Sequence, residues 1–315
     1  MTSAAFIAID WGTTTARAYR LDASGMVLDV RTAQLGIQHV QDGRFRDAMD
    51  TLLGDWRHEP APRLACGMIG SRQGWVEAPY VDCPSPLAAL ADGIVHTPDG
   101  ALAIVPGIRT RDAHGIPDVM RGEETQIAGV VDAHEQRVLV VLPGTHCKWA
   151  RVESGRIVDF TTYMTGELYH VLIKHSILGR LSVPGSGGGT GPGFARGVER
   201  GLEPGALGHD MFGARTLALM GELPREDVAD WLSGILIGRE VRNARTWAHR
   251  QGYDGARARL VGEHALVARY QLAFAQADVI VERADTHAAA HGLWRIAQSA
   301  GIVSRLHEIP DRHPT

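Results

Sequence analysis

The chain of 315 residues has only three cysteines and no long apolar segment. Three widely spaced cysteines without a CxxC pair exclude a disulfide-stapled scaffold and predict reduced thiols, at Cys66, Cys83 and Cys147. The longest strictly apolar stretch that ends in a turn covers residues 138–143, whereas a membrane-spanning helix needs roughly 20 residues. Residues 1–9 lack the basic start and cleavage pattern of an export signal. We therefore expect a cytoplasmic protein with no membrane partner.

An excess of positive charge is also lacking. The 32 Lys and Arg against 36 Asp and Glu give a net charge of -4, so no general basic field attracts nucleic acid. The sequence has no GxxxxGK[ST] loop, no GxGxxG between a strand and a helix, no HExxH and no GxSxG. These absences argue against the usual helix-terminus phosphate sites, a zinc site and a hydrolase nucleophile. The composition is that of an ordinary globular protein, and the length favours two domains.

What the sequence does contain is a strand, a Gly/Thr turn and two further strands. Residues 4–9 are apolar and end at Asp10, and Gly12, Thr13 and Thr14 lie in the turn that follows. Residues 16–21 alternate between apolar and polar, as do residues 26–32 after a turn at Ser24-Gly25. This pattern predicts a three-stranded meander, followed by a helix at about residues 44–57.

The second half repeats this layout. Residues 138–142 predict a buried strand, Gly144 and Thr145 lie in a Gly/Thr turn, and residues 148–153 and 156–162 predict two strands around a turn at Ser154-Gly155. A helix should cover residues 167–178. The repeat predicts one duplicated α/β unit, with domains at residues 1–135 and 136–315.

The rest of the chain predicts further helices and strands. Residues 182–194 contain many glycines and predict a flexible surface connection. Arg239, Arg242 and Arg245 have helical spacing and predict a solvated face, and alternation points the Lys148 side chain to solvent. Helices are expected at residues 210–220, 225–237, 264–276 and 287–300, and strands at residues 259–261 and 278–282.

A strand that ends in Asp before a Gly/Thr turn can bind a metal and a phosphate. Asp10 would face a cleft where a divalent cation is held by oxygen ligands, and the amides and hydroxyls of Gly12, Thr13 and Thr14 would donate to phosphate oxygens. Alone, the motif is commonly just a turn with an Asx hydrogen bond. The second turn at Gly144-Thr145 is expected to face the first across an interdomain cleft and to bind the same polyphosphate.

Six segments carry a resemblance to a known family: IDWGTTTARAY, GMIGSRQGW, DVMRGEETQ, LPGTHCKW, YMTGELYH and LSGILIGRE. Together they resemble the successive motifs of the 2-dehydro-3-deoxygalactonokinase family, in the superfamily of sugar kinases, actin and heat-shock ATPases, over residues 5–303. The resemblance implies two ribonuclease-H-like domains, each with a mixed sheet flanked by helices, around a cleft for ATP and Mg²⁺. It implies phosphate loops at residues 10–14 and at Gly144-Thr145, and an adenosine-contacting glycine at Gly262. The family usually has a small residue where Glu263 follows.

A sugar kinase needs a base to take the proton of the attacking hydroxyl. Glu123 and Glu124 precede the second phosphate strand, where related sugar kinases carry an Asn-Asp pair whose Asp is the base. Either glutamate is a candidate by this resemblance. The structural alternative is that both merely begin a helix, where negative charge is favoured by the macrodipole.

The substrate implied by the family is a 2-keto-3-deoxy sugar acid, so a carboxylate must be bound. Arg72 and Arg121 are candidates because a guanidinium binds carboxylates with two parallel hydrogen bonds. Sugar contacts are expected from Ser71, Gln73 and Trp75 in the segment GMIGSRQGW. The resemblance adds Thr165 and Glu167 in YMTGELYH, where related sugar kinases carry a Gly-Glu that touches sugar hydroxyls. Each has a structural alternative: the arginines as solvated surface groups, Trp75 as a core residue and Thr165 as a helix N-cap.

The resemblance thus implies ATP-dependent phosphorylation of 2-dehydro-3-deoxy-D-galactonate at its 6-hydroxyl. Two other functions stay open. One is a kinase of the same fold that acts on another hexose or sugar acid, and the other is a nucleotide-switched binding module. The residues leave the oligomeric state open, including a homodimer.

Overall fold

The computed structural model describes residues 4–132, 134–253 and 257–304. Contacts divide the chain into two compact units. The first holds the described residues up to His134, the segment Gly155–Ile157 and the described residues from His287, and the second holds the described parts of the segments Glu135–Ser154 and Val158–Thr286. The expected C-terminal domain ran to residue 315, whereas the contacts place the chain from His287 with the first unit. The reason is that the last helix packs its apolar face onto the first unit's sheet.

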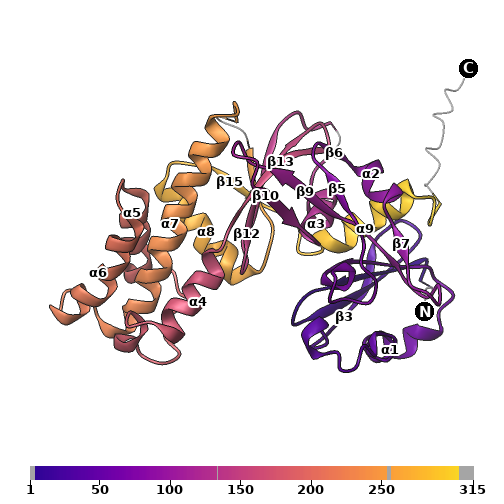
Figure 1. The fold of residues 1–315 in the computed structure, drawn as a ribbon, viewed down its shortest axis with the longest axis horizontal. Helices are drawn as coiled ribbons and strands as arrows, with labels where there is room; N and C mark the ends of the chain where they lie inside the picture. Colours follow the sequence, from indigo (N-terminus) through magenta and orange to yellow (C-terminus); the bar gives the residue numbers. More distant parts are fainter. Residues whose placement is uncertain (1–3, 133, 254–256, 305–315) are drawn as a thin grey trace, which may run out of the picture. The chain divides into compact units, whose positions relative to one another are not determined.

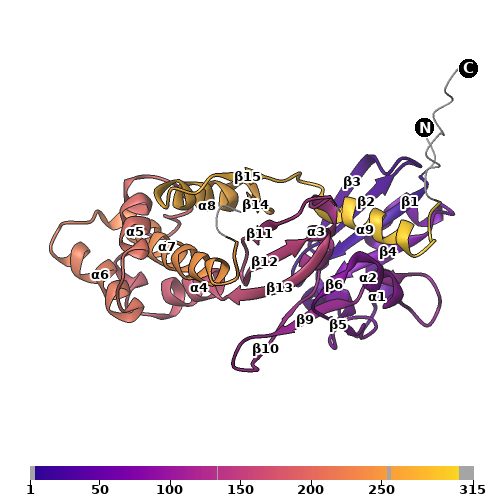
Figure 2. The ribbon, with the colours of Figure 1, turned by 90° about the horizontal axis from the view of Figure 1, so that it is seen from above.

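The first unit contains the predicted meander. Its six-stranded sheet has the order β3-β2-β1-β4-β8-β7, in which β1 pairs antiparallel with β2 and parallel with β4 (Figure 2). The strands are β1 (Phe6–Trp11), β2 (Ala16–Leu21), β3 (Val27–Ala33), β4 (Arg63–Gly67), β7 (Val95–His96) and β8 (Ala103–Ile104). Parallel pairing of β1 with β4 brings the carboxyl ends of both strands to one edge of the sheet.

Helices cover both faces of this sheet. Because successive strand residues face opposite sides, Ile7 and Ile9 pack with Met49 of α1, whereas Phe6 packs with Trp294 of α9 at a ring distance of 5.7 Å. The helical segments are α1 (Phe45–Leu53), α2 (Leu87–Asp92), α3 (Glu123–Val130), α9 (Ala288–Ser299), η1 (Ile37–His39), η2 (Gly54–His58) and η3 (Met68–Gly70). The helix expected at residues 44–57 is therefore α1 followed by η2.

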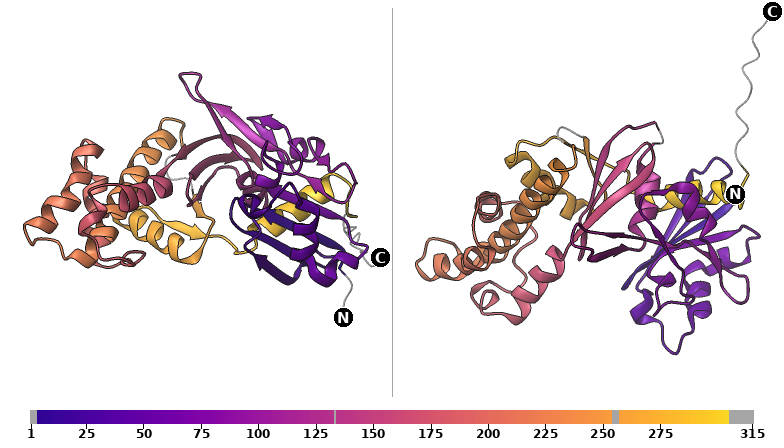
Figure 3. Two further views of the ribbon diagram at one scale, coloured as in Figure 1. Left: turned by 60° about the horizontal axis from the view of Figure 1, so that its bottom comes forward. Right: turned by 45° about the horizontal axis from the view of Figure 1, so that its top comes forward.

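A small sheet in the first unit was not predicted. It has the order β10-β9-β5, with strands β5 (Tyr80–Asp82), β9 (Gly107–Arg111) and β10 (Pro117–Met120), and the β9–β10 hairpin is seen in Figure 3. A further short strand, β6 (Ser85–Pro86), pairs with Arg156 and Ile157. Strands this short carry too few alternating residues to be found from sequence.

The second unit repeats the strand order of the first. Its strands run β15-β14-β11-β12-β13, and β11 pairs antiparallel with β12 and parallel with β14. The strands are β11 (Val138–Leu142), β12 (Cys147–Glu153), β13 (Arg156–Tyr163), β14 (Arg257–Leu260) and β15 (Val281–Arg283). The order β13-β12-β11-β14 matches β3-β2-β1-β4, so the predicted duplication is confirmed.

The helices α5 (Pro192–Leu202), α7 (Val228–His249) and α8 (His264–Gln276) pack on one face of this second sheet (Figure 1). A separate apolar cluster joins α4 (Thr165–His175) and α6 (Leu207–Leu219) to the start of α7. The short helices are η4 (Gly179–Leu181) and η5 (Arg225–Asp227). Glycines let α5 and α7 touch through their backbones: a Cβ added at Gly201 would lie 2.9 Å from the Arg239 amide nitrogen.

Three surface predictions were wrong. The connection expected to run to residue 194 ends earlier, because α5 begins at Pro192 and Phe194 is fully buried. Arg239 is buried and pairs with Asp210 Oδ2 at 2.7 Å, so the arginine stripe is not a solvated face at that position. Lys148 is buried and donates from Nζ to Thr162 Oγ1 at 2.8 Å. The buried Asp210 carboxylate compensates the charge of Arg239, and the partly buried Thr162 hydroxyl gives Lys148 a hydrogen-bond acceptor.

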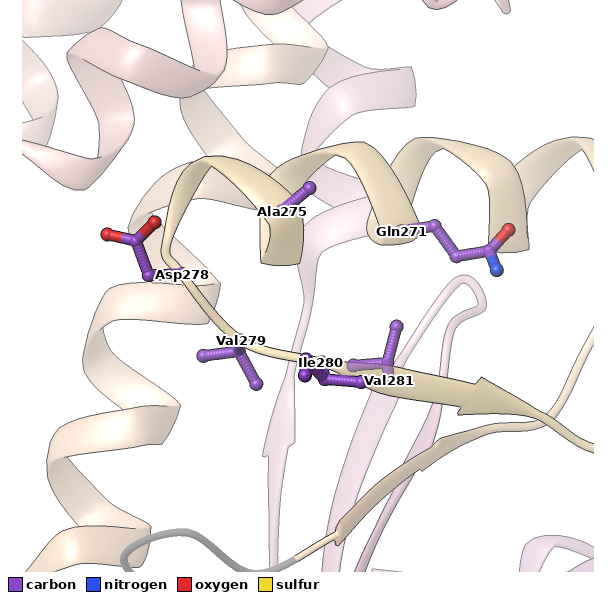
Figure 4. A pocket seen from close by; sticks show the side chains of 6 residues that line it. All are labelled: Gln271, Ala275, Asp278, Val279, Ile280 and Val281. Atoms are coloured by element: carbon purple, nitrogen blue, oxygen red, sulfur yellow. The ribbon is translucent and has the colours of Figure 1, made fainter.

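An open pocket of ≈ 530 Å³ lies where α8 ends and β15 begins (Figure 4). Gln271 and Ala275 border it from α8, and Val279, Ile280 and Val281 border it from the following segment. It contains none of the expected site residues. In the part of the chain that the structure describes, no helix is long and apolar enough to cross a membrane.

Candidate functional site

Asp10 lies at the carboxyl end of β1, between Arg17 of β2 and Cys66 of β4 in the strand register. The Cys66 thiol donates to Asp10 Oδ1 at 3.9 Å. Burial raises the pKa of the Asp10 carboxyl, and the nearby Arg17 and the thiol oppose that rise. Asp10 therefore lies where the sequence predicted it, at the carboxyl end of a buried strand.

The first Gly/Thr turn is held by the segment that follows β3. Gly36 donates to the Thr14 carbonyl at 2.9 Å, and Gln38 donates to the Thr13 carbonyl at 3.1 Å. The Gly12 amide donates to the Thr15 carbonyl at 2.9 Å, so it is not the free donor that the sequence suggested. Within the described residues, the amides of the exposed Thr13 and Thr14 have no hydrogen-bond partner. The turn therefore presents two amides and two hydroxyls to solvent.

Two glycines bring the Glu123-Glu124 segment to Asp10. A Cβ added at Gly67 would lie 2.7 Å from the Trp11 carbonyl oxygen and 3.5 Å from Asp10 Oδ1, and one added at Gly122 would lie 3.1 Å from Gly67 Cα. Both glycines have positive φ, +91° and +109°, which other residues rarely adopt. The sequence analysis did not single out Cys66 and Gly67. They are the last two residues of β4, and Gly67 lies close to both Asp10 and Gly122.

The two glutamates begin α3 but differ in exposure. Glu124 is fully buried, and its carboxylate accepts from the Gly122 amide at 2.7 Å and from Thr125 Oγ1 at 2.9 Å. Glu123 is partly exposed and accepts from the Arg121 amide at 3.0 Å. Burial, followed by the neighbouring Glu123, raises the pKa of Glu124 to about 8. Only Glu123 of this pair has surface that a bound molecule can touch.

Replacing Glu124 by glutamine is expected to remove a loss of stability at rising pH. The folded-state pKa of about 8 lies above the ordinary 4.5, so this carboxyl does not lower stability below pH 4.5 and destabilises increasingly toward pH 8. At about pH 8 the free energy of unfolding of the variant should exceed that of the wild type by on the order of a few kcal/mol. Glutamine can keep both hydrogen bonds, to the Gly122 amide and Thr125 Oγ1. Urea unfolding of both proteins at about pH 5 and about pH 8 measures this difference. The prediction is contradicted if the free energy of unfolding changes equally with pH in the two proteins.

Arg121 precedes the Glu123-Glu124 pair in sequence, and its side chain contacts Ala78 and Tyr80, just after the expected sugar contacts of residues 71–75. Its Nη2 donates to the Ala78 carbonyl at 2.8 Å, and its guanidinium lies 4.3 Å from the centre of the Tyr80 ring. Nε and Nη1 of Arg121 and the hydroxyl of Ser71 are buried, and none of them has a hydrogen-bond partner among the described residues. Buried donors without acceptors cost free energy, which fits a site for an acceptor group.

The other residues of this segment differ in placement. Arg72 is 87% exposed and pairs with Glu77 at 3.6 Å, and Gln73 is exposed. Trp75 stacks on Phe45 at a ring distance of 6.3 Å and packs against the core. The first unit thus gathers Asp10, the glutamate pair and the Ser71–Trp75 segment around β4 and its continuation.

The second Gly/Thr turn follows β11 and touches the start of α4. Thr145 is exposed, and its carbonyl accepts from the Glu167 amide at 3.0 Å. A Cβ added at Gly166 would lie 2.8 Å from Thr145 Cα, so only glycine allows this approach. His146 Nε2 is hydrogen-bonded to Glu167 Oε2. The two turn residues and Glu167 therefore lie together in the second unit.

Gly262 lies beside the same turn. The Val261 amide donates to the Val141 carbonyl at 2.9 Å, and a Cβ added at Gly262 would lie 3.5 Å from the Pro143 carbonyl oxygen. The expected adenosine glycine and the second phosphate turn therefore follow neighbouring parallel strands, β14 and β11. This is the arrangement expected when one ligand bridges the carboxyl ends of such strands.

One site-linked residue was missed in the second unit. Glu240 of α7 is buried and accepts from Thr165 Oγ1, which begins α4. The Thr165 hydroxyl therefore donates to Glu240 and does not cap α4. A glutamate inside the apolar stretch of α7 is the signal that could have found it, because a buried carboxylate needs partners.

Comparisons with known proteins agree along nearly the whole chain. The family model described as 2-keto-3-deoxy-galactonokinase matches residues 10–296. The 2-dehydro-3-deoxygalactonokinase of Escherichia coli (strain K12) is 37% identical over 312 residues, which are 98% of this chain and 99% of that protein.

Solved structures agree with this match. A crystal structure from Sinorhizobium meliloti, provisionally described as a 2-dehydro-3-deoxygalactonokinase, has a TM-score of 0.83 and 32% identity, covering 93% of this chain and 98% of that one. Component A of the Acidaminococcus fermentans (R)-2-hydroxyglutaryl-CoA dehydratase, with a TM-score of 0.51 at 12% identity over 94% of this chain and 98% of that one, shares the fold alone. The expected actin-like ATPase fold is confirmed, and the chain belongs to the 2-keto-3-deoxy-galactonokinase family of sugar kinases.

Proposed function

We propose that this chain transfers the γ-phosphoryl group of ATP to the 6-hydroxyl of 2-dehydro-3-deoxy-D-galactonate in the cytoplasm. The observation that carries the proposal is the near-full-length match to a relative named for this substrate. The placement of Asp10 and the Glu123-Glu124 pair around Gly67 supports it, since a kinase needs a cation-binding carboxylate and a base near one another.

Asp10 is the proposed Mg²⁺-binding residue. Among the described residues, no group of three or more His, Cys, Asp or Glu side chains could hold a metal ion. Mg²⁺ does not need such a group, because it commonly binds one or two carboxylates together with phosphates and waters. Asp10 fits, since its hydrogen bond from the Cys66 thiol, at 3.9 Å, is weak. Bound Mg²⁺ would neutralise charge on the phosphates.

Glu123 is the proposed base. The group that takes the proton must reach the attacking hydroxyl, and Glu124 has no exposed surface. Glu123 is partly exposed, and the Arg121 amide holds one of its oxygens at 3.0 Å. Glu124 would then position the start of α3 through its bonds to Gly122 and Thr125.

The sugar acid carboxylate is proposed to bind Arg121. Two of its nitrogens are buried without partners among the described residues, and the Ser71 hydroxyl is likewise buried and unpartnered. A carboxylate would supply the missing acceptors, once the side chain of Tyr80 moves from the guanidinium. The exposed Arg72 and Gln73 and the partly buried Trp75 would contact the rest of the sugar.

The nucleotide is proposed to use both Gly/Thr turns. Thr13 and Thr14 would donate to its phosphates from the first unit, and Gly144, Thr145 and Gly262 would contact phosphate and adenosine from the second. The binding of one triphosphate by both turns stays a prediction.

A coupled assay tests the reaction. With ATP and Mg²⁺, ADP should form rapidly only when 2-dehydro-3-deoxygalactonate is added, and mass spectrometry with NMR should find the 6-phosphate. Faster turnover of the gluconate-derived isomer would instead favour a kinase of another sugar acid. Slow ATP hydrolysis that ignores every sugar acid would favour the nucleotide-switched binding module and contradict the proposal.

A further inference from the structure

Glu240 lies in an unusual environment for an ionisable side chain. It belongs to a run of buried residues, 231–241, in α7, and only 2% of its surface is exposed. An unpaired carboxylate there would strongly destabilise the folded state. Its neighbours in this run are mostly apolar or glycine. The carboxylate must therefore be compensated by the groups around it.

Four side chains hydrogen-bond to this one carboxylate. Trp149 Nε1 donates to Oε1 at 2.6 Å, and Tyr270 OH donates to Oε2 at 2.8 Å. The Thr165 hydroxyl also donates to Oε2, and the Cys147 thiol is hydrogen-bonded to the same side chain. An indole N–H can only donate, and a carboxylate offers about four acceptor positions. An amide keeps one acceptor oxygen and has an NH2 donor in place of the other, so it fits here only if the hydroxyls of Thr165 and Tyr270 turn to accept.

The donors come from three segments that carry the second unit's candidate nucleotide residues. Cys147 and Trp149 belong to β12, which begins directly after the turn of Gly144 and Thr145. Thr165 begins α4, next to Gly166, whose backbone lies against that turn. Tyr270 belongs to α8, the helix that follows Gly262. One carboxylate therefore links the phosphate turn, the start of α4 and the adenosine segment.

We infer that Glu240 is a positioning residue for nucleotide binding, which fixes β12, α4 and α8 relative to one another. The inference rests on the proposed function only in naming ATP as the ligand. The residue need not touch the ligand: it holds the turn and Gly262 in the spacing that the nucleotide requires. Misplacement of binding groups by about 1 Å can cost about 10²-fold in turnover.

Two variants test the inference, Glu240→Gln and Tyr270→Phe. Glutamine keeps the shape but removes the negative charge and replaces one acceptor oxygen by a donor, so the hydrogen bonds of Thr165 and Tyr270 must reverse. Phenylalanine removes only the contact from α8. Both are expected to raise the KM for ATP, Glu240→Gln by about tenfold or more, and to weaken the binding of ADP measured by calorimetry without sugar. Tyr270→Phe should leave the KM for the sugar acid unchanged.

Asp210→Asn is the matched control. Asp210 is also a buried carboxylate of the second unit, but its partners are Arg200 and Arg239 of α5 and α7. The Asp210→Asn substitution should lower the thermal unfolding temperature and leave the KM for ATP unchanged.

The inference is overturned if Glu240→Gln behaves like this control, with lower thermal stability but unchanged ADP affinity and ATP KM. If Glu240→Gln does not fold, Tyr270→Phe decides by the same two measurements. Failure of the wild type to phosphorylate the sugar acid, with ADP binding lost in Glu240→Gln, would overturn the proposed function and leave this inference standing.

Discussion

The Asp10→Asn protein is expected to lose phosphoryl transfer by a factor on the order of 10³ and to remain folded. The neutral amide is a poorer ligand for Mg²⁺ than a carboxylate, so neutralisation of phosphate charge fails. The fold should persist because burial raises the pKa of Asp10, which means that the ionised form already costs free energy there. Initial rates at several Mg²⁺ concentrations, together with thermal unfolding, measure both effects.

Asp29→Asn serves as the control for this variant. Asp29 lies in β3 of the same sheet and is exposed, and its side chain accepts from the Val30 amide. Its turnover should equal that of the wild type. Wild-type turnover in Asp10→Asn at low Mg²⁺ would remove Asp10 from the metal site.

Replacing Glu123 by glutamine is expected to lower kcat by about 10²- to 10⁴-fold, the usual contribution of a general base. The side-chain oxygen of glutamine can still accept from the Arg121 amide, so the geometry of the segment should be kept. The KM for ATP should change little, because Glu123 is not placed among the nucleotide contacts. Pre-steady-state and steady-state rates with ATP and the sugar acid measure the loss.

Glu124→Gln is the matched comparison for this test. If Glu123 is the base, Glu124→Gln should keep most of its activity, since glutamine can make both of the hydrogen bonds of Glu124. If instead Glu124→Gln loses its activity and Glu123→Gln keeps it, the base is Glu124. In that case the wild-type rate would rise with pH through the Glu124 pKa of about 8, and this rise would disappear in Glu124→Gln.

Local patterns in the sequence were sufficient for the repeated part of the fold. Both apolar runs before the Gly/Thr turns form strands: β11 has the predicted bounds 138–142, and β1 (Phe6–Trp11) lies two residues later than the predicted 4–9. Helix α8 also has the predicted bounds. The short strands β5, β9 and β10 were missed, because they carry too few alternating residues to give a local pattern.

Within the candidate site, the sequence pointed to motif residues but not to the residues that connect them. The proximity of Asp10 to Gly122 depends on Gly67, more than 50 positions away from each in sequence, and neither pattern nor composition reports such a contact. The two neighbouring glutamates looked equivalent in sequence. Their difference in exposure arises because α3 turns only one of them into the interior.

The sequence by itself therefore determined the duplicated α/β unit, the two Gly/Thr turns and the family, since these depend on residues close together in the chain. Only the tertiary structure decided that Lys148 and Arg239 are buried, that the Gly12 amide is occupied, and that Glu240 collects donors from three segments. The physical reason is that burial and hydrogen-bond satisfaction depend on every group packed around a side chain, and most of those groups are distant in sequence.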